Sequence, residues 1–281
     1  MANTIDADLL IDTLSEKVVT FLGPRLAPLR AFSKDFSTDE LVQGKNVQVP
    51  LVTAGSTTLT NPTSFEAGDS VTSNIPVPVN HISQPFHITS AQYNQRFRIE
   101  QLAQGNLHTF ANALSDIWTA LVLTGTYGTG ATIAQASFVA ATAKTLWGGL
   151  GLSAQKYLLL DSVAFAQLAP ENKNAFSLGE SGAYGFDGIF QQTRWTGATA
   201  NTYGFACGPD AIAVAAGIPL QAPGVAQEMV SQRVVTIEGL GLSVQVNVWI
   251  SRASRAMWCS YDVMFGAAPA LATAGDIIIS A

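Results

Sequence analysis

The sequence predicts a mixed α+β protein built around one long helix and long antiparallel strands, and three observations support this. Apolar residues recur at spacings of three and four from Arg98 to Leu123, over about six helical turns. Apolar and polar residues alternate from Leu242 to Ile250, as in a strand with two different faces. Residues 41–92 show alternation and prolines without a helical period, which predicts a protruding two-stranded β-ribbon.

The composition is unusually poor in charge. Of the 281 residues, 14 are basic and 20 acidic, which is 12% charged, against about 25% in an ordinary soluble domain. A net charge of −6 argues against a protein that reads nucleic acid through a basic stripe. No stretch of 18 apolar residues predicts a membrane span. Cys207 and Cys259 are too few for a disulfide framework and fit a reduced cytoplasmic setting.

The charges are also unevenly distributed along the chain. Residues 1–40 hold 11 of the 34, and residues 41–95 hold three. In residues 195–227 Asp210 is alone. A compact monomer of this mass has an accessible area of about 11,600 Å², over which 34 charges are sparse. We therefore expect the two charge-poor segments to be buried between subunits of an assembly.

The N-terminal arm is predicted to be an amphipathic helix. Leu10, Leu14 and Val18 form one apolar stripe, acidic residues suit its first turn, and Gly23-Pro24 is expected to end it. One interpretation is that this helix packs on the core of its own subunit. The other is that it docks on a neighbouring subunit or an assembly factor, with Leu10, Leu14, Val18 and Arg25 in the contact.

The predicted ribbon combines an alternating strand at 47–51 with one at 75–79, where Pro76 and Pro78 favour an edge position. About 22 residues rich in Ser, Thr, Asn and Gly join the two strands. A ten-residue strand extends roughly 33 Å, so the tip is expected far from the body. Its low charge suggests that it contacts a partner. The candidate contact residues are Asn61, Phe65, Glu66 and Asp69.

The remaining elements follow the long helix, whose candidate spine residues are Arg98, Leu102, Phe110 and Leu114. Tyr157–Leu160 is predicted to be a buried strand, and Asp161 the N-cap of a helix that ends at Leu168. Residues 179–188 form a glycine-rich loop carrying Glu180, Tyr184 and Phe186. A short apolar helix or strand is expected over 211–216. Strands are expected over 256–265, pairing with 242–250, and over 277–279.

No catalytic, cofactor or metal site is predicted. His81, His87 and His108 have no cysteine or carboxylate at ligand spacing. Residues 179–183 approach a nucleophile elbow, but Ala183 stands where glycine is needed, and no histidine follows. The acidic residues of the arm lack the glycine and glutamate of a calcium loop, and the Gly-rich run 125–130 lacks the lysine of a phosphate loop.

The order of these parts resembles the major capsid (coat) protein family of tailed bacteriophages, over essentially the whole chain. Local stretches are similar to that family too. They are Leu26-Ala-Pro-Leu-Arg-Ala-Phe-Ser33 leading into Val47-Gln-Val-Pro50, Tyr157–Leu168, Gly204–Ala215 and Ser260-Tyr-Asp-Val-Met-Phe-Gly266. Each pattern is weak alone, and their order and spacing together carry the resemblance.

The resemblance implies four regions. Residues 1–38 would be the N-terminal arm and 39–95 an extended loop that overlaps an adjacent subunit. Residues 96–139 and 226–281 would form the peripheral domain, with its spine helix and long sheet. Residues 140–225 would form the axial α/β domain, with its glycine-rich loop near the five- and six-fold axes.

The resemblance also implies a function. Pentamers and hexamers would close into an icosahedral shell that encloses double-stranded DNA without sequence-specific contact. The protein would assemble in the host cytoplasm and reside in the virion, with no membrane and no cofactor. A portal and a cement protein are further implied partners. The predicted helix near residue 5 leaves no room for a scaffolding segment, which favours a separate scaffolding protein.

Residues 53–74 contain no lysine, which argues against the subunit crosslinks of some relatives. The alternatives are a bacterial nanocompartment (encapsulin-like) shell of the same fold and, more distantly, a soluble hydrolase.

Overall fold

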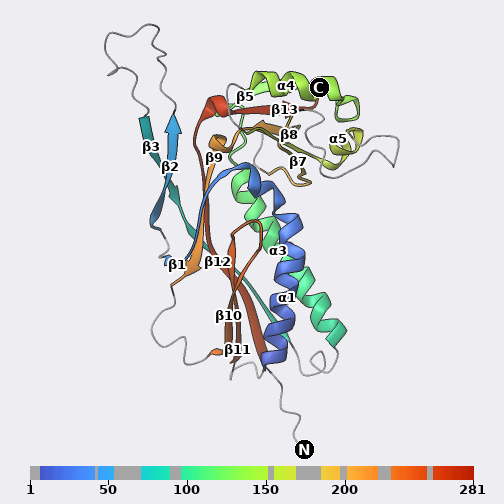
Figure 1. The fold of residues 1–281 in the computed structure, drawn as a ribbon. Coiled ribbons are helices and arrows are strands. Elements are labelled where there is room, and N and C mark those ends of the chain that lie inside the picture. The colour runs from blue at the N-terminus through green and yellow to red at the C-terminus, as the bar shows by residue number, and fades with distance from the viewer. Residues whose placement is uncertain are drawn as a thin grey trace, which may run out of the picture.

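A computed structural model gives the arrangement of the chain (Figure 1). The structure describes residues 7–41, 44–53, 71–88, 96–150, 155–168, 185–196, 201–220, 229–251 and 256–281. They form a mixed α+β protein with two separate β-sheets, a two-stranded ribbon and two long helices. No helix of these residues is long and apolar enough to cross a membrane.

The larger sheet has six strands. Its path runs β1 (Ser33–Leu41), β9 (Ile212–Pro219), β12 (Ala256–Pro269), β11 (Ser243–Ser251) and β10 (Met229–Thr236). The sixth strand, β4 (Asn80–Ile88), pairs with the first part of β12, while β9 pairs with its last part. The predicted pairing of the two C-terminal strands is confirmed, with Trp249 opposite Trp258. Because β12 is 14 residues long, it can pair with β4 and with β9 along the same edge.

Two helices cover one face of this sheet: α1 (Ala7–Arg25) and α3 (Arg96–Thr119) (Figure 1). The sheet presents Leu242, Val244, Val246 and Val248 to the common core, where Phe110 and Leu114 of α3 are buried. The long helix is confirmed, and its apolar spacing is what places one stripe in the core. Helix α1 continues beyond the predicted end, with Pro24 in its last turn.

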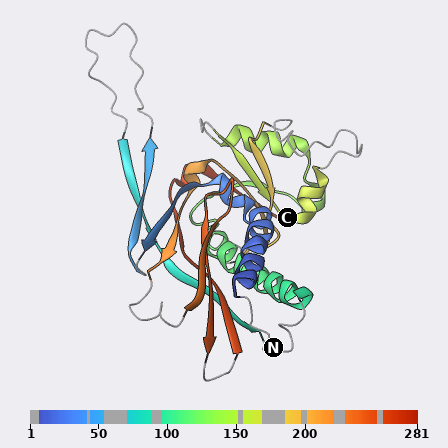
Figure 2. The same cartoon turned by 60° about the horizontal axis from the view of Figure 1, so that its bottom comes forward.

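The ribbon consists of β2 (Asn46–Thr53) and β3 (Val71–Pro78), paired antiparallel with Val49 opposite Ile75. Both views show it standing away from the body (Figures 1 and 2). The ribbon is shorter than predicted, because the chain after Pro78 enters the large sheet as β4. Residues 54–70, which include all four candidate tip residues Asn61, Phe65, Glu66 and Asp69, lie outside the described residues.

The second sheet has five strands in the order β5 (Gly128–Thr132), β13 (Gly275–Ile279), β8 (Thr202–Cys207), β6 (Tyr157–Leu160) and β7 (Gly188–Gln191). Helices α4 (Ala140–Gly149) and α5 (Ser162–Gln167) pack on this sheet and form with it the second body of the molecule, at the top of Figure 1. The large sheet with α1 and α3 is the first body. Asp161 caps α5 as predicted, its carboxylate accepting a hydrogen bond from the Ala164 N–H at 2.9 Å. Short 3-10 turns (27–31, 135–137, 209–211, 272–274) link the elements.

Sheet membership corrects the region boundaries expected from the sequence. The last strand, β13, and the early strand β5 belong to the second sheet, although the expected boundaries place both in the peripheral domain. Conversely, β9 belongs to the large sheet, as do β1 and β4 from the arm and the extended loop. Strands far apart in sequence pair wherever hydrogen bonding and apolar faces match, so contiguous segments do not define the two bodies.

The charge-poor segment 195–227 also has a different explanation from the one expected. Strand β8 has one half-buried and five buried residues, and β9 has seven buried and one half-buried. These strands lack charge because they lie inside their own subunit, in the middle of the two sheets. The expectation of burial between subunits is therefore wrong for the described part of this segment.

Candidate assembly surfaces

The arm helix α1 is a part of the subunit core. Leu10 is 3% exposed, and Leu14 and Val18 are fully buried against α3 and the sheet. Lys17 pairs with Glu100 of α3 at 3.2 Å, and Asp12 pairs with Arg233 of β10. The prediction that Leu10, Leu14 and Val18 contact a neighbour is corrected, and the own-core interpretation holds. Arg25, the fourth residue of that set, stays exposed, with its guanidinium 5.0 Å from the Phe21 ring.

The four predicted spine residues of α3 also differ in how far they are buried. Phe110 and Leu114 are buried, Leu102 is half-buried and Arg98 is exposed. Such a helix supports the sheet from one side and leaves polar residues along the other.

The ribbon rests on the outer face of the large sheet, opposite the helices. Val49, Val77 and Val79 form a small cluster with Ala213, Ala215, Met264 and Ala268. At Gly266 the chain of β12 passes so close to β3 that a Cβ would overlap the carbonyl oxygen of Pro78. The base of the ribbon is thus fixed on the sheet, while its strands extend away from the body (Figure 2).

A row of aromatic side chains crosses the far end of that outer face. Trp249 of β11 lies opposite Trp258 of β12, which lies opposite His87 of β4. The two indole rings stack with centroids 6.3 Å apart, and the His87 ring lies 5.2 Å from Trp258. Met229 of β10 lies opposite Trp249 and extends the row. The two tryptophans are half-buried and His87 is exposed, so this aromatic row is a candidate contact surface.

Polar residues occupy the middle of the same face. The carboxylate of Asp262 accepts a hydrogen bond from Asn247 Nδ2 at 2.7 Å and another from Ser260 Oγ. His81 Nε2 lies 3.1 Å from Asp262 Oδ1. In a hydrolase triad the histidine stands between serine and acid, whereas here Asp262 stands between Ser260 and His81. This arrangement orders the sheet and does not activate the serine.

The glycine-rich loop is only partly described. Glu180 and Tyr184 lie outside the described residues. Phe186 is 1% exposed and belongs to the core of the second sheet, so it is not a surface contact. Nearby, Lys156 donates from Nζ to the carbonyl of Trp147 at 2.7 Å and lies 4.3 Å from its ring. That ammonium satisfies a carbonyl of the last turn of α4.

A further contact between the two bodies was not predicted. Arg194 donates to both carboxylate oxygens of Asp116 on α3, at 2.5 and 2.9 Å, and Thr196 donates to the same carboxylate at 3.0 Å. Trp195 meets Trp118 edge-on at 6.0 Å between ring centroids. The ion pair joins residues 78 positions apart, so no local spacing in the sequence indicates it.

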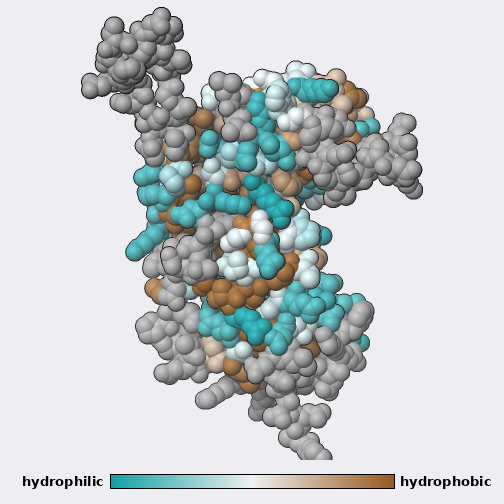
Figure 3. All heavy atoms as spheres, in the orientation of Figure 1, coloured by the Kyte–Doolittle hydropathy of each residue, from teal (hydrophilic) through white to brown (hydrophobic). Residues whose placement is uncertain are grey.

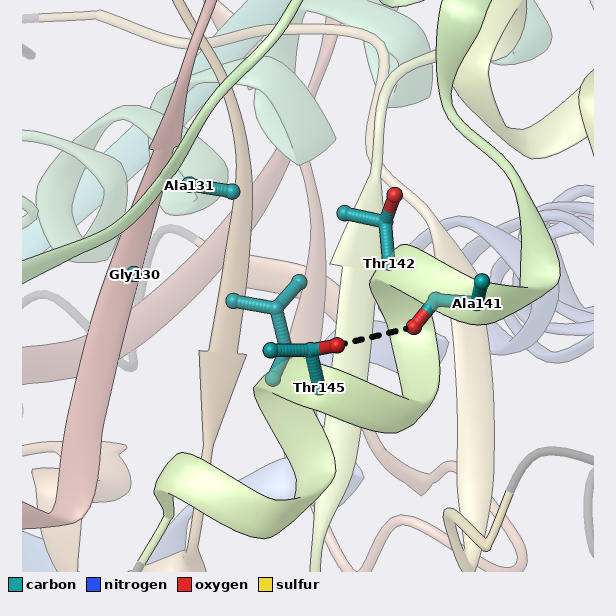
Figure 4. Close-up of a pocket in the computed structure, with 6 residues that line it drawn as sticks. Gly130, Ala131, Ala141, Thr142 and Thr145 are labelled. Carbon is teal, nitrogen blue, oxygen red and sulfur yellow. Dashed lines mark hydrogen bonds between the residues drawn. The ribbon is translucent and has the colours of Figure 1, made fainter.

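The described residues offer little for small-molecule chemistry. A hollow of about 320 Å³ lies between β5 and α4, lined by glycine, alanine, threonine and leucine (Figure 4). Its labelled threonine Thr145 donates to the Ala141 carbonyl within its own helix. No group of metal-ligating side chains occurs among the residues that the structure describes.

Both cysteines are free and buried, and burial raises the pKa of the Cys259 thiol to about 12 and also raises that of Cys207. A buried thiol with such a pKa is not a nucleophile at neutral pH.

Comparison with protein-family models finds no match to the chain, and neither does comparison with curated proteins. Solved structures do match. A chain of Mycobacterium phage Cain is 10% identical, with 92% of this chain and 90% of that chain covered and a TM-score of 0.51. A virus-like particle from Pyrococcus furiosus is 11% identical, with 94% and 98% covered and a TM-score of 0.50. The capsid of an empty GTA particle is 11% identical, with 92% and 90% covered and a TM-score of 0.50.

These likenesses span nearly the whole length of both partners, so they concern the overall fold of the chain. The predicted α+β fold of tailed-phage capsid proteins is confirmed.

Proposed function

We propose that this chain is a major capsid protein, which assembles as pentamers and hexamers into an icosahedral shell around the double-stranded DNA of a tailed phage. The observation that carries the proposal is the ribbon. A subunit that holds the base of a two-stranded ribbon against its own sheet, and directs the rest away from itself, is built to reach another subunit. The fold shared with capsid chains supports this interpretation.

The role proposed is structural and not enzymatic. Each subunit would contribute several small contacts, namely the ribbon tip, the aromatic row and the outer parts of the second body. Contacts that are weak singly become strong together when every subunit engages several neighbours, which permits correction during growth. A shell made by such heterologous contacts closes because the rotations between subunits form closed rings.

The partners follow from the same proposal. A separate scaffolding protein would guide closure, a portal would occupy one vertex, and a cement protein is a further candidate. The subunit carries a net charge of −6, which suits a wall that holds DNA without binding it tightly. Assembly would take place in the host cytoplasm and end in the virion.

A bacterial nanocompartment shell is the second candidate, and the likeness to the Pyrococcus furiosus virus-like particle favours it as an alternative. The two differ in what the particle contains. A phage shell is expected to package DNA through a portal, whereas a compartment shell encloses a cargo protein.

Electron microscopy of the purified protein, expressed alone and with its scaffolding protein, tests the proposal. Closed shells with five-fold vertices are the expected result. A monomer at every concentration and in both preparations would contradict the proposal. The nucleic-acid and protein content of the shells distinguishes the phage capsid from the nanocompartment.

A further inference from the structure

We propose that β10 is an interaction edge, at which the large sheet of one subunit pairs antiparallel with β10 of a second copy across a two-fold axis. This inference rests on the proposed function, because icosahedral shells contain two-fold axes. It adds to that function a named strand, a partner and a register.

Most edge strands of the described residues carry features that discourage pairing. Strand β1 has four charged residues, β4 contains Pro85, and β2 and β3 contain three prolines. Strands β5 and β7 are only five and four residues long. Charge, proline and shortness are the usual means of blocking an edge. Strand β10 has eight residues, no proline and one charge, so it is the long edge left open.

The backbone of β10 is oriented for pairing. Ile237 N–H donates to the Leu242 carbonyl at 2.8 Å, and Val235 and Arg233 follow as partners of Val244 and Val246. Hydrogen-bonded pairs alternate along an antiparallel ladder, so these residues direct their backbone groups toward β11. The residues between them, Gln232, Val234 and Thr236, direct their N–H and C=O groups away from the sheet. An incoming strand would meet the outward-directed donor and acceptor groups of three alternate residues.

The side chains of this edge suit a second copy of the same strand. Val230 and Val234 are 44% and 42% exposed, and hydrophobic surface lies over the β10 region in Figure 3. Pairing centred on Val234 places it against Val234 of the second copy, beyond the irregularity at residues 229–231. Gln232 then lies opposite Thr236 of the second copy. Cross-strand pairs of this kind, apolar with apolar and polar with polar, favour the contact.

The charges are compatible with a self-pairing edge. In this register Arg233 lies opposite Val235 of the second copy, so no two like charges face each other. The Arg233 guanidinium is already paired with Asp12 of α1 in its own subunit. A charge that is neutralised within each copy does not oppose the approach of the other.

The interface area that this pairing would bury is small. Five residues from each copy bury far less than the roughly 1,200 Å² of a stable pairwise interface. Free subunits are therefore expected to pair at this edge only at high concentration, and the pairing to become stable when other contacts hold two subunits together.

A cysteine scan of β10 tests the inference. Across a hydrogen-bonded pair the Cα atoms are about 5.5 Å apart, which is within the range that a disulfide spans. The variant V234C is therefore expected to give disulfide-linked dimers on a non-reducing gel after mild oxidation of assembled particles. The native cysteines do not interfere, because both are fully buried.

The matched control is Q232C, which is exposed on the same strand. In the proposed register, residue 232 is four positions from its own copy, about 14 Å along the strands, so Q232C is not expected to crosslink. A second pair of variants tests assembly. Val234→Lys is expected to lower particle yield at least tenfold, and Val19→Lys, at an exposed site on α1, to leave it unchanged.

Particles of V234C that stay uncrosslinked, or Q232C particles that crosslink to the same extent, would overturn the inference and leave the proposed function standing. Failure of the wild-type protein to form particles would contradict the proposed function itself. Crosslinking would then be scored on concentrated subunits, where the same two outcomes support or overturn pairing through β10.

Discussion

The carbonyl oxygen of Pro78 lies directly against Gly266, in the space that a side chain at that position would occupy. The Pro78 carbonyl carbon and the Val79 Cα lie 2.9 and 3.2 Å from the same point. All three atoms belong to the backbone, which cannot swing aside as a side chain can. The crossing of ribbon and sheet therefore depends on glycine at residue 266.

Replacing Gly266 by valine is expected to displace the base of the ribbon and to cost roughly 1–3 kcal/mol in the free energy of unfolding. Chemical denaturation measures this destabilisation, and hydrogen exchange of residues 71–79 locates it. The control is Gly105→Ala in α3, where a Cβ meets no atom within 4 Å. It is expected to stabilise the helix by about 0.5–1 kcal/mol. Equal stability of the Gly266→Val variant and the wild type would contradict the close approach.

Removing the ribbon tip is expected to separate folding from assembly. A variant that replaces residues 54–70 by a short turn keeps the β2–β3 ladder and its seat on the sheet. Because the β2–β3 ladder and the cluster that seats it on the sheet lie outside the replaced segment, the variant should unfold with the same cooperativity as the wild type and fail to form stable shells. Circular dichroism and electron microscopy measure the two properties. Normal shells from this variant would refute the role given to the ribbon.

Substitution in the aromatic row is expected to affect assembly more than stability. Trp249→Ser leaves the core face of β11 unchanged, because Trp249 lies on the opposite, outer face. If the row binds a neighbouring subunit, the subunit concentration needed for assembly rises about tenfold for each 1.4 kcal/mol of binding free energy that the substitution removes. Light scattering as a function of subunit concentration measures this assembly threshold. A matched change at an exposed valine, Val19→Ser on α1, should leave this threshold unchanged. Equal assembly thresholds for the two variants would contradict the prediction that the aromatic row contacts a neighbouring subunit.

Asp276 should make the subunit less stable as the pH rises. Burial raises the pKa of its carboxyl group above the ordinary 3.8. A group that binds its proton more tightly in the folded state stabilises the protein while protonated, and this contribution disappears as the pH rises through the folded pKa. Asp276→Asn removes the ionisation, so the variant should gain stability relative to the wild type between the acid range and neutrality. Denaturation at several pH values measures this, and two parallel profiles would contradict it.

Much of the architecture was predictable, because it depends on local periodicity. The three-and-four spacing of apolar residues in 98–123 indicates a helix with one buried stripe. The alternation of apolar and polar residues in 242–250 indicates a strand. Asp161 before an apolar helix is a capping signal that works within four residues. The order of these parts was then sufficient to suggest the fold.

The contacts between the parts were not predictable in the same way. Arg194 and Asp116, or Gly266 and Pro78, are brought together by chain crossings that leave no spacing in the sequence. The arm stripe illustrates the limit: Leu10, Leu14 and Val18 suit a neighbouring subunit as well as their own core, and only the structure shows that α3 and the sheet already bury them.

By itself, the sequence determined the two long helices, the helix that Asp161 caps, about half of the strands and the order that suggests the fold, because periodicity and caps act over a few residues. The tertiary structure decided which sheet each strand joins, which charge-poor segment is interior, and which edge stays open. The physical reason is that burial and pairing are properties of surfaces meeting in space. The strands β9 and β10 have the same length, yet β9 is interior because strands pair with both of its edges, whereas β10 is mostly exposed because only β11 pairs with it.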